Sequence, residues 1–381
     1  MLFLDGNRIE LLRNGAQFFP ALCAAIDGAR DEVHLETYIF ADDGVGEKVA
    51  WALARAAGRG VRVRVLVDGF GSIGFSARLR RMLAESGADL RFYRPVRFWG
   101  PWREGLRRLH RKTACIDNAV AFVGGINIVD DVERGRPGPP RFDYAVRVEG
   151  PLSGRVRAEA ARLWTRLTAG RRAPVPPPPG PAPGPRADGA RAALLVRDSL
   201  RHRRDIERAY RALIDRASKE VIIANAYFLP RRGLRLALQR AARRGVRVAL
   251  VLQGQFEYLL LHLASRATYE RLLAAGVEIW EYRRSFLHAK VATFDGRVAC
   301  VGSSNLDPYS LLLARESNVF VDDTGFTATL RASLLEEMHT GAERITHEAW
   351  RRLPWWRRLR FRAAVVLMRV LLAFAGAERY R

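Results

Sequence analysis

Nearly continuous apolar segments alternate with amphipathic ones along the first half of the chain. The segments "EVHLETYIF" (32–40) and "VRVRVLVDG" (61–69) are apolar enough to be buried strands, and "GEKVAWALARAAGRG" (46–60) between them has helical spacing. The second half repeats this order at 219–230, 233–245 and 246–254. Strands that are apolar on both faces are typical of sheets covered by helices on both sides. The pattern therefore predicts a duplicated α/β fold whose sheets are mostly parallel or mixed and flanked by helices.

A proline-rich segment separates the two halves. Residues 173–189, "APVPPPPGPAPGPRADG", contain eight of the 18 prolines of this 381-residue chain. Such a segment favours an extended, solvated conformation and cannot join a hydrophobic core. We therefore expect a first domain at 1–172, a linker at 173–189 and a second domain at 190–346, followed by a distinct C-terminal segment at 347–381.

One short motif occurs once in each half. It reads "HRKTACID" followed by "GGIN" in the first half, and "HAKVATFD" followed by "GSSN" in the second. With 7 His and only four Lys in the chain, a His-x-Lys triplet is expected by chance ~0.07 times, so two copies at identical spacing are no accident. The polar residues of the motif are His110, Lys112, Asp117 and Asn127 in the first copy, and His288, Lys290, Asp295 and Asn305 in the second.

Each His-x-Lys triplet falls in a predicted strand, at 109–117 and at 286–295. Because residues two apart on a strand face the same way, the imidazole and the ammonium of each copy should project together. Asp117 is followed by Asn and Asp295 by Gly, which is typical of hairpin turns. The two Asp residues therefore fit either a turn or direct chemistry, and both interpretations stay open.

Two such half-sites that face each other contain the groups needed to cleave a phosphodiester. One imidazole can attack phosphorus to give a phosphohistidine, while the other protonates the departing alkoxide and then activates an incoming alcohol or water. The lysines and asparagines can stabilise negative charge on the phosphoryl oxygens. The sequence has neither a carboxylate cluster of the two-metal type nor Cys/His spacing for zinc, so we expect no metal and no cofactor.

The paired motifs resemble the HxKxxxxD motifs of the phospholipase D superfamily, whose members build one active site between two such domains. The segments "ETYIFADDGVG", "RVRVLVDGFGS", "FDYAVRVEGP" and "GSSNLDPYSL" are similar to those of the short bacterial cardiolipin synthases, the type without N-terminal transmembrane helices. The resemblance covers nearly the whole chain outside the linker. It implies two phospholipase D-like domains related by a pseudo-twofold axis, an active site between them, and a phosphatidyltransferase activity.

The resemblance also implies roles for individual residues. His110 takes the position of the nucleophile and His288 that of the general acid and base. The implied catalytic set is His110, Lys112, Asp117, His288, Lys290 and Asp295. The implied phosphate-binding set is Asn127, Asn305, Lys112 and Lys290. The superfamily tends to place an acidic residue on a later strand behind each histidine, and Asp143 and Glu316 are the candidates that would hold each imidazole in the useful tautomer.

Charge and the C-terminal segment restrict the partners. A net charge of +24 and a pI of about 11.1 indicate a polyanionic partner, either nucleic acid or an anionic membrane surface. The segment 351–377 joins Trp355, Trp356 and an arginine cluster to a 13-residue apolar stretch at 363–375. Such a stretch gives ~20 Å of helix, less than the ~30 Å core of a bilayer, so we expect a basic amphipathic helix in the membrane interface. Packing of this helix against the protein is the alternative, and nucleic acid is not an expected partner.

Cysteine usage and the N-terminal segment bear on location. The three cysteines, Cys23, Cys115 and Cys300, form no disulfide framework and indicate a reducing compartment. Residues 1–15 resemble neither a signal peptide nor a membrane span. We therefore expect a peripheral protein on the cytoplasmic face of the cell membrane, and the oligomeric state stays open.

These observations lead to one functional hypothesis and three alternatives. The hypothesis is a cardiolipin synthase, in which His110 attacks the phosphate of one phosphatidylglycerol and releases glycerol, and His288 activates a hydroxyl of a second one. The alternatives are a hydrolytic phospholipase D that makes phosphatidic acid, a metal-independent phosphodiesterase acting on nucleic acid, and a non-enzymatic basic protein that coats membranes. The complete motifs argue against the last, and the apolar C-terminal segment argues against the nuclease.

Overall fold

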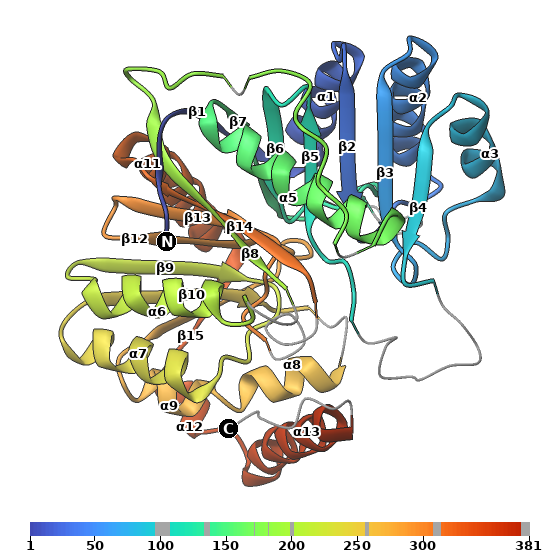
Figure 1. Cartoon of the computed structure of the whole chain (residues 1–381). Helices are drawn as coiled ribbons and strands as arrows, with labels where there is room; N and C mark the ends of the chain where they lie inside the picture. The colour runs from blue at the N-terminus through green and yellow to red at the C-terminus, as the bar shows by residue number, and fades with distance from the viewer. Residues whose placement is uncertain are drawn as a thin grey trace.

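The computed structural model describes residues 1–95, 107–132, 138–170, 172–181, 183–198, 202–255, 259–307 and 314–374. Their strands form one 15-stranded mixed sheet that runs through both halves of the chain, with helices packed on it (Figure 1). The predicted α/β fold is therefore confirmed.

The first half runs from β1 to α5. Its elements are β1 (Leu4–Arg13), α1 (Asn14–Asp27), β2 (Glu32–Thr37), α2 (Gly44–Gly58), β3 (Arg62–Asp68), α3 (Ala77–Glu85), β4 (Asp89–Tyr93), β5 (Lys112–Ile116), β6 (Val120–Gly124), β7 (Tyr144–Glu149) and α5 (Pro151–Thr168). The strands and the helix predicted at 32–40, 46–60 and 61–69 correspond to β2, α2 and β3. Asp43 begins α2 by accepting hydrogen bonds from the backbone N–H groups of Val45 and Gly46.

The second half repeats the first and adds elements at its end. Its elements are β8 (Ala190–Arg197), α6 (Asp205–Arg216), β9 (Glu220–Asn225), α7 (Arg232–Arg243), β10 (Arg247–Gln253), α8 (Leu259–Arg266), α9 (Tyr269–Leu273), β11 (Glu278–Tyr282), β12 (Lys290–Phe294), β13 (Val298–Gly302), β14 (Glu316–Asp322), α11 (Thr324–Gly341), β15 (Ala342–Ile345), α12 (His347–Arg351) and α13 (Trp355–Phe374).

The order of the strands is symmetric about the β1–β8 pair. Outward from β1 the sheet reads β7, β6, β5, β2, β3 and β4, and outward from β8 it reads β14, β13, β12, β9, β10 and β11, with β15 added at the edge. The strands β1 and β8 are antiparallel, with Leu4 opposite Ala192. Matching strands therefore lie on opposite sides of this pair, which is the pseudo-twofold arrangement expected of a duplicated domain.

Among the strands of the described residues, parallel ladders occur only in the outer part of each half. The neighbours β2, β3 and β4 are parallel, as are β9, β10 and β11. The strands that carry the motifs instead form antiparallel hairpins, β5 with β6 and β12 with β13. At their turns Asp117, Asn118, Asp295 and Gly296 have φ between 51° and 65°, as tight hairpin turns require. The sheet is thus mixed because these hairpins occupy its middle.

Three hydrophobic cores hold the halves and join them. The helices α1, α2 and α3 pack on the first half, with Leu22 and Leu53 fully buried, and α6, α7 and α9 pack on the second. A third core contains Val146 of β7, Val301 of β13 and Leu330 of α11, so it belongs to both halves. Because this shared core is apolar and fully buried, it fixes how the two motif copies face each other.

The proline-rich linker is extended and mostly exposed, but it is attached to the first half. The buried Arg157 of α5 donates hydrogen bonds of 2.8 Å to the carbonyls of Pro176 and Pro177. Asn118 donates to the carbonyl of Gly180 at 3.0 Å. The sequence predicted a solvated spacer, and the structure adds this attachment, which Arg157 can make because it also pairs with Glu32 at 2.7 Å.

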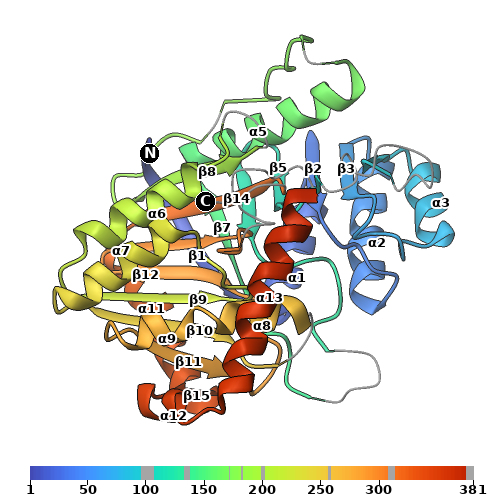
Figure 2. The same cartoon turned by 90° about the horizontal axis from the view of Figure 1, so that it is seen from below.

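The C-terminal helix α13 lies across α8 on the side of the molecule seen from below (Figure 2). Phe361, Ala364 and Met368 are buried, and the last two share a core with Leu261 and Ala264 of α8. The opposite face exposes large apolar side chains: Trp355, Trp356, Leu359, Val366, Leu367, Val370 and Leu371. The helix is therefore docked on the protein by one face and has a second apolar face in solvent. Within the described residues, no helix combines the length and the apolar character needed to cross a bilayer.

Candidate active site

The two histidines lie just before the motif strands rather than on them. The strands β5 and β12 begin at Lys112 and Lys290, and the predicted strands at 109–117 and 286–295 were therefore three and four residues too long at their starts. The preceding segments instead make isolated parallel bridges, Leu109 with Arg315 and Leu287 with Phe142. Both bridges cross from one half of the chain to the other, so each histidine is placed by the opposite half.

Each imidazole is held by a carboxylate from the other half. The Nδ1 atom of His288 lies 2.6 Å from Asp143 Oδ2. The Nδ1 atom of His110 lies 3.0 Å from Glu316 Oε1 and 3.2 Å from Glu316 Oε2, which is its hydrogen-bond partner. The backbone N–H groups reinforce the exchange, because His110 donates to the carbonyl of Arg315 and His288 to that of Phe142, both at 2.9 Å. The candidates Asp143 and Glu316 thus contact the motif histidines crosswise, and the two half-sites form one site.

The motif lysines lie directly behind their histidines. Lys112 Nζ donates a 2.7 Å hydrogen bond to the carbonyl of His110, and Lys290 Nζ donates to the carbonyl of His288. Both lysine side chains are almost completely buried, whereas the imidazoles keep 17% and 13% of their side-chain surface exposed. The ammonium groups are therefore fixed inside the site, and the imidazole edges remain open to a substrate.

Burial dominates the protonation of the site. It lowers the pKa of both His110 and His288; nearby Lys290 adds to the effect at His288, and Glu316 offsets part of it at His110. Burial also lowers the pKa of Lys112 to about 7 and raises that of Asp143 to about 7. At neutral pH both imidazoles are then uncharged, with Nδ1–H donating to the carboxylate and the Nε2 lone pair directed away from it.

The two asparagines of the motifs are buried beside these groups. Asn127 is 5% exposed and accepts a hydrogen bond from the backbone N–H of Ile39 at 3.2 Å through Oδ1, which leaves the Nδ2 side of the amide for another partner. Asn305 is 3% exposed, and no described residue bonds its Oδ1. Both follow the ends of β6 and β13 by three residues, as the repeated spacing requires. An amide from each half therefore accompanies the imidazole and the ammonium.

The motif aspartates lie apart from the histidines, at the hairpin turns, and their place in the catalytic set stays a prediction. Asp117 accepts hydrogen bonds of 2.8–2.9 Å from the backbone N–H groups of Arg30, Asp31 and Glu32. Asp295 accepts equivalent bonds from residues 218–220. Each lies at the far end of its strand from the histidine. The structure therefore supports the turn interpretation, because each carboxylate anchors the start of the neighbouring strand.

Two residues outside the predicted catalytic and phosphate-binding sets, Tyr38 and Asp68, also shape the site. The Tyr38 ring lies 4.9 Å from the His110 ring, and Lys112 Nζ lies 5.4 Å from the centre of the same tyrosine ring. Asp68, at the end of β3, accepts a 2.7 Å hydrogen bond from the backbone N–H of Leu109. Their position at the ends of buried strands was the available signal, since the ends of parallel strands gather at one edge of a sheet.

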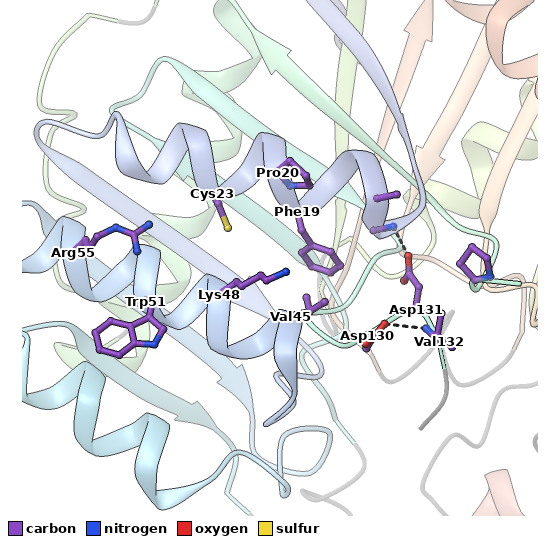
Figure 3. Close-up of a pocket in the computed structure, with 13 residues that line it drawn as sticks. Phe19, Pro20, Cys23, Val45, Lys48, Trp51, Arg55, Asp130, Asp131 and Val132 are labelled. Carbon is purple, nitrogen blue, oxygen red and sulfur yellow. Dashed lines mark hydrogen bonds between the residues drawn. The ribbon is translucent and has the colours of Figure 1, made fainter. Parts of the chain in front are cut away.

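Other polar groups and hollows lie apart from the motifs. Glu36 pairs with Arg111 and accepts a hydrogen bond from the Thr113 hydroxyl, so it holds the residues on either side of Lys112 at the start of β5. A cavity of about 670 Å³ between α1 and α2 is lined by Phe19 and Trp51, among others, and by none of the motif residues (Figure 3). Across the described part of the chain, no group of three or more His, Cys, Asp or Glu is placed to hold a metal ion.

Two halves that each bring an imidazole, an ammonium and an amide to one site, and exchange carboxylates across a pseudo-twofold axis, define a protein of the phospholipase D type. The family model described as "Cardiolipin synthase, PLD-like domain" matches residues 22–132 and 210–338. The chain therefore belongs to this family of the phospholipase D superfamily.

Relatives of known name support the same placement. Cardiolipin synthase B of Escherichia coli K12 is 39% identical over 363 residues, which cover 92% of this chain and 85% of that protein. Cardiolipin synthase A of Proteus mirabilis is 31% identical over 376 residues, covering 93% of this chain and 74% of that protein. Among solved structures, phosphatidylserine synthase of Haemophilus influenzae superposes with a TM-score of 0.71 and 14% identity over 96% of both chains, which shows a shared fold.

Proposed function

We propose that this protein is a cardiolipin synthase, a phosphatidyltransferase that joins two phosphatidylglycerol molecules and releases glycerol. The observation that carries the proposal is the crosswise pairing of His110 with Glu316 and of His288 with Asp143, which brings two oriented imidazoles into one site. The choice of substrate is supported by the relatives named cardiolipin synthase.

In the first half-reaction His110 is the nucleophile. Its Nε2 lone pair attacks the phosphorus of one phosphatidylglycerol, a P–N bond forms, and the bond from phosphorus to the glycerol oxygen breaks. His288 enters this step as an imidazolium and gives its Nε2 proton to the departing oxygen. Burial disfavours the imidazolium in the empty site, and the bound phosphodiester anion supplies the negative charge that restores it.

In the second half-reaction His288 acts as the base. Its neutral Nε2 removes the proton from a hydroxyl of the second phosphatidylglycerol, and the oxygen attacks the phosphohistidine. The P–N bond breaks, cardiolipin leaves, and His110 returns to its neutral form while His288 again carries the proton. In both steps His110 therefore forms or breaks the bond to phosphorus, and His288 gives or takes the proton. A single half-site has only one imidazole and cannot do both.

Lys112, Lys290, Asn127 and Asn305 bind the phosphoryl oxygens. The four side chains are buried and held by the framework, so little reorganisation is needed as negative charge develops in the transition state. Lys112 has a pKa of about 7 in the empty site, and a bound phosphate anion raises it, so the ammonium is strongest when substrate is present.

The enzyme works at the surface of the cell membrane, as a peripheral protein on its cytoplasmic face. The exposed apolar face of α13 and the arginines beside it support this location, because such a helix lies in the interface between headgroups and acyl chains. Phosphatidylglycerol, as an anionic lipid, is also attracted by the net charge of +24.

Product analysis tests the function. The purified protein is incubated with phosphatidylglycerol vesicles, with His110→Ala as the control, and the lipids and free glycerol are quantified. We expect cardiolipin and glycerol in equal amounts from the wild type and neither from the variant. Phosphatidic acid in place of cardiolipin would assign the protein to the hydrolytic alternative, and no turnover by the wild type would remove phosphatidylglycerol as its substrate.

A further inference from the structure

An arginine-lined groove lies beside the C-terminal helix. It has a volume of about 750 Å³ and is bounded by the start of α7, by α9 and by α13. Six arginines line it: Arg231, Arg232, Arg235, Arg271, Arg362 and Arg369. Among the described residues, Glu270 is its one acidic lining residue, and the closest approach of this carboxylate to Arg362 is 3.7 Å. The groove is therefore strongly cationic and selects an anionic ligand.

The helix α13 divides its surface into three faces. Phe361, Ala364 and Met368 are buried, and the last two pack with α8, which docks the helix. The next face around the helix turns Arg362, Val366 and Arg369 toward the groove. Leu367, Val370 and Leu371 follow on the outer face, where between 43% and 50% of each residue is exposed. Cationic and apolar surfaces thus adjoin along one helix.

We propose that this groove is a second, non-catalytic site that binds the phosphate headgroup of an anionic phospholipid whose acyl chains lie along the exposed face of α13. Guanidinium groups suit phosphate because they donate several hydrogen bonds in a fixed plane. A soluble phosphate or a nucleotide would use the arginines alone and would leave the adjoining apolar residues in water. A phospholipid offers a phosphate to the arginines and acyl chains to the apolar residues. It is therefore the ligand that fits both surfaces.

The groove is separate from the reacting groups and is linked to the second half-site through a backbone contact. Its lining residue Leu229 donates a backbone hydrogen bond of 2.9 Å to the carbonyl of Leu306, the residue after Asn305. A lipid in the groove would therefore hold the half-site of Asn305 against the membrane surface. The site stands whether the enzyme transfers a phosphatidyl group or hydrolyses its substrate, since neither histidine lines the groove.

Counting bound lipids tests the proposal. Full-length His110→Ala protein, which cannot turn over, is titrated calorimetrically with dihexanoyl phosphatidylglycerol below its micelle concentration. The groove variant adds Arg271→Gln and Arg369→Gln to this protein. The matched control adds Arg357→Gln and Arg360→Gln, which remove the same charge from exposed positions at the start of α13 that do not line the groove. Thermal melts verify that all three proteins are folded.

The groove variant should bind one lipid fewer per chain than its parent, and the matched control should bind as many as the parent. Dihexanoyl phosphatidylcholine should not bind in the groove, and inorganic phosphate should not displace the lipid from it. An equal number of lipids in both variants, an equal loss in both, or displacement by phosphate would overturn the proposal. A parent that binds one lipid and a groove variant that binds none would support it while counting against phosphatidylglycerol binding at the histidines.

Discussion

The two half-sites carry the same three functional groups on the same framework, yet their surroundings differ. His288 lies 2.6 Å from Asp143, while His110 lies 3.0 Å from Glu316, which also accepts a 2.5 Å hydrogen bond from Ser303. At the position of Ser303 the first half has Gly125, where a Cβ atom would collide with the Asp143 carboxylate. The residue after the motif glycine therefore differs together with the carboxylate that it contacts. In the first half Gly125 lies beside Asp143, and in the second half Ser303 lies beside Glu316.

A second difference lies at the ends of the neighbouring strands. Tyr38 follows β2 and its ring contacts that of His110 at a tilted angle, whereas Ala226 holds the matching place after β9. Asp68 ends β3 and accepts from the backbone of the histidine segment, whereas Gln253 ends β10 and donates to it at 3.2 Å. The first half-site thus has one carboxylate more at its histidine segment, whereas the shorter contact between imidazole and carboxylate is that of His288.

This asymmetry fits the proposed division of labour. A phosphohistidine forms with positive charge on the imidazole, which the negative surroundings of His110 stabilise. The pKa of His288 is lowered well below its usual value by burial and by the cationic groups Lys290 and Lys112. A lower pKa makes the imidazolium a stronger acid toward the departing alkoxide. The two halves thus share one framework, and the residues around each histidine differ in a way that suits His110 to attack phosphorus and His288 to transfer the proton.

Removing either histidine should have the largest effect. We expect His110→Ala and His288→Ala each to lower kcat by about 10⁴-fold or more, because each step loses its nucleophile or its acid and base. Assays with labelled phosphatidylglycerol measure the loss. His288→Ala should retain slow formation of the covalent intermediate, while His110→Ala should form none; the opposite trapping pattern would exchange the two roles.

Removing the carboxylates should reproduce these effects crosswise. Asp143→Asn should lower kcat by about 10²–10³-fold through His288, and Glu316→Gln should do so through His110, because each keeps the shape but loses the charge that orients the imidazole. In a double-mutant cycle, Asp143→Asn should add little to His288→Ala. Full additivity of that pair, with strong coupling of Asp143 to His110 instead, is the result that contradicts the crosswise site.

The glycine and serine beside the carboxylates should respond unequally. Gly125→Ala should lower kcat about tenfold or more, because the new Cβ displaces the Asp143 carboxylate that holds His288. Ser303→Ala removes one hydrogen bond to Glu316 and should cost roughly threefold to tenfold. Kinetics of both variants measure the ratio, and a larger loss in Ser303→Ala would show that the Glu316 side is the more sensitive one.

The pH profile should reveal Lys112. With a lowered pKa of about 7, its ammonium is lost as pH rises through this value, so kcat/KM should show a further fall above about pH 7, beyond the fall that the low pKa of His288 produces at lower pH. The fall in kcat should come at higher pH, because bound phosphate raises the pKa. Lys112→Arg keeps its charge throughout and should show lower activity without the alkaline fall. An identical alkaline fall in this variant would assign the titration to another group.

The motif aspartates should affect stability more than activity. Asp295→Asn weakens the hydrogen bonds that anchor residues 218–220 and should lower the free energy of unfolding by about 1–3 kcal/mol, with kcat of the folded protein within about twofold. Although burial acts in the opposite direction, the backbone N–H groups lower the pKa of Asp295. Its contribution is therefore present above the unfolded pKa of about 4 and is lost as pH falls through the lower folded value. Thermal melts at several pH values measure this, and a large loss of kcat without loss of stability would support the place of Asp295 in the catalytic set.

Much of the fold and of the site could be predicted from the sequence, because local sequence patterns determine these parts. Apolar runs located β2, α2 and β3 and their counterparts, and the repeated spacing located the histidines, lysines and asparagines. The crosswise exchange of Asp143 and Glu316 could not be predicted, because it depends on how the two halves dock. That docking comes from the shared core and the β1–β8 pair, whose contacts join residues far apart in the chain.

Two further features depend on long-range contacts. The attachment of the linker rests on Arg157, one of many arginines in the sequence and not distinguishable from the others there. For α13 the sequence offered a choice between the membrane interface and the protein surface. In the structure one apolar face of α13 is docked on the protein. A second apolar face is exposed, so the helix can also contact the membrane interface.

Trapping the covalent intermediate in the carboxylate variants tests the central claim most directly. Asp143→Asn and Glu316→Gln proteins are mixed with labelled phosphatidylglycerol, quenched at intervals and analysed for labelled peptides. If each carboxylate serves the histidine of the other half, Asp143→Asn should accumulate label on the His110 peptide, because the proton transfers through His288 are impaired and resolution is slow. Glu316→Gln should accumulate almost none, because attack by His110 is impaired. Accumulation in Glu316→Gln and none in Asp143→Asn would contradict the account.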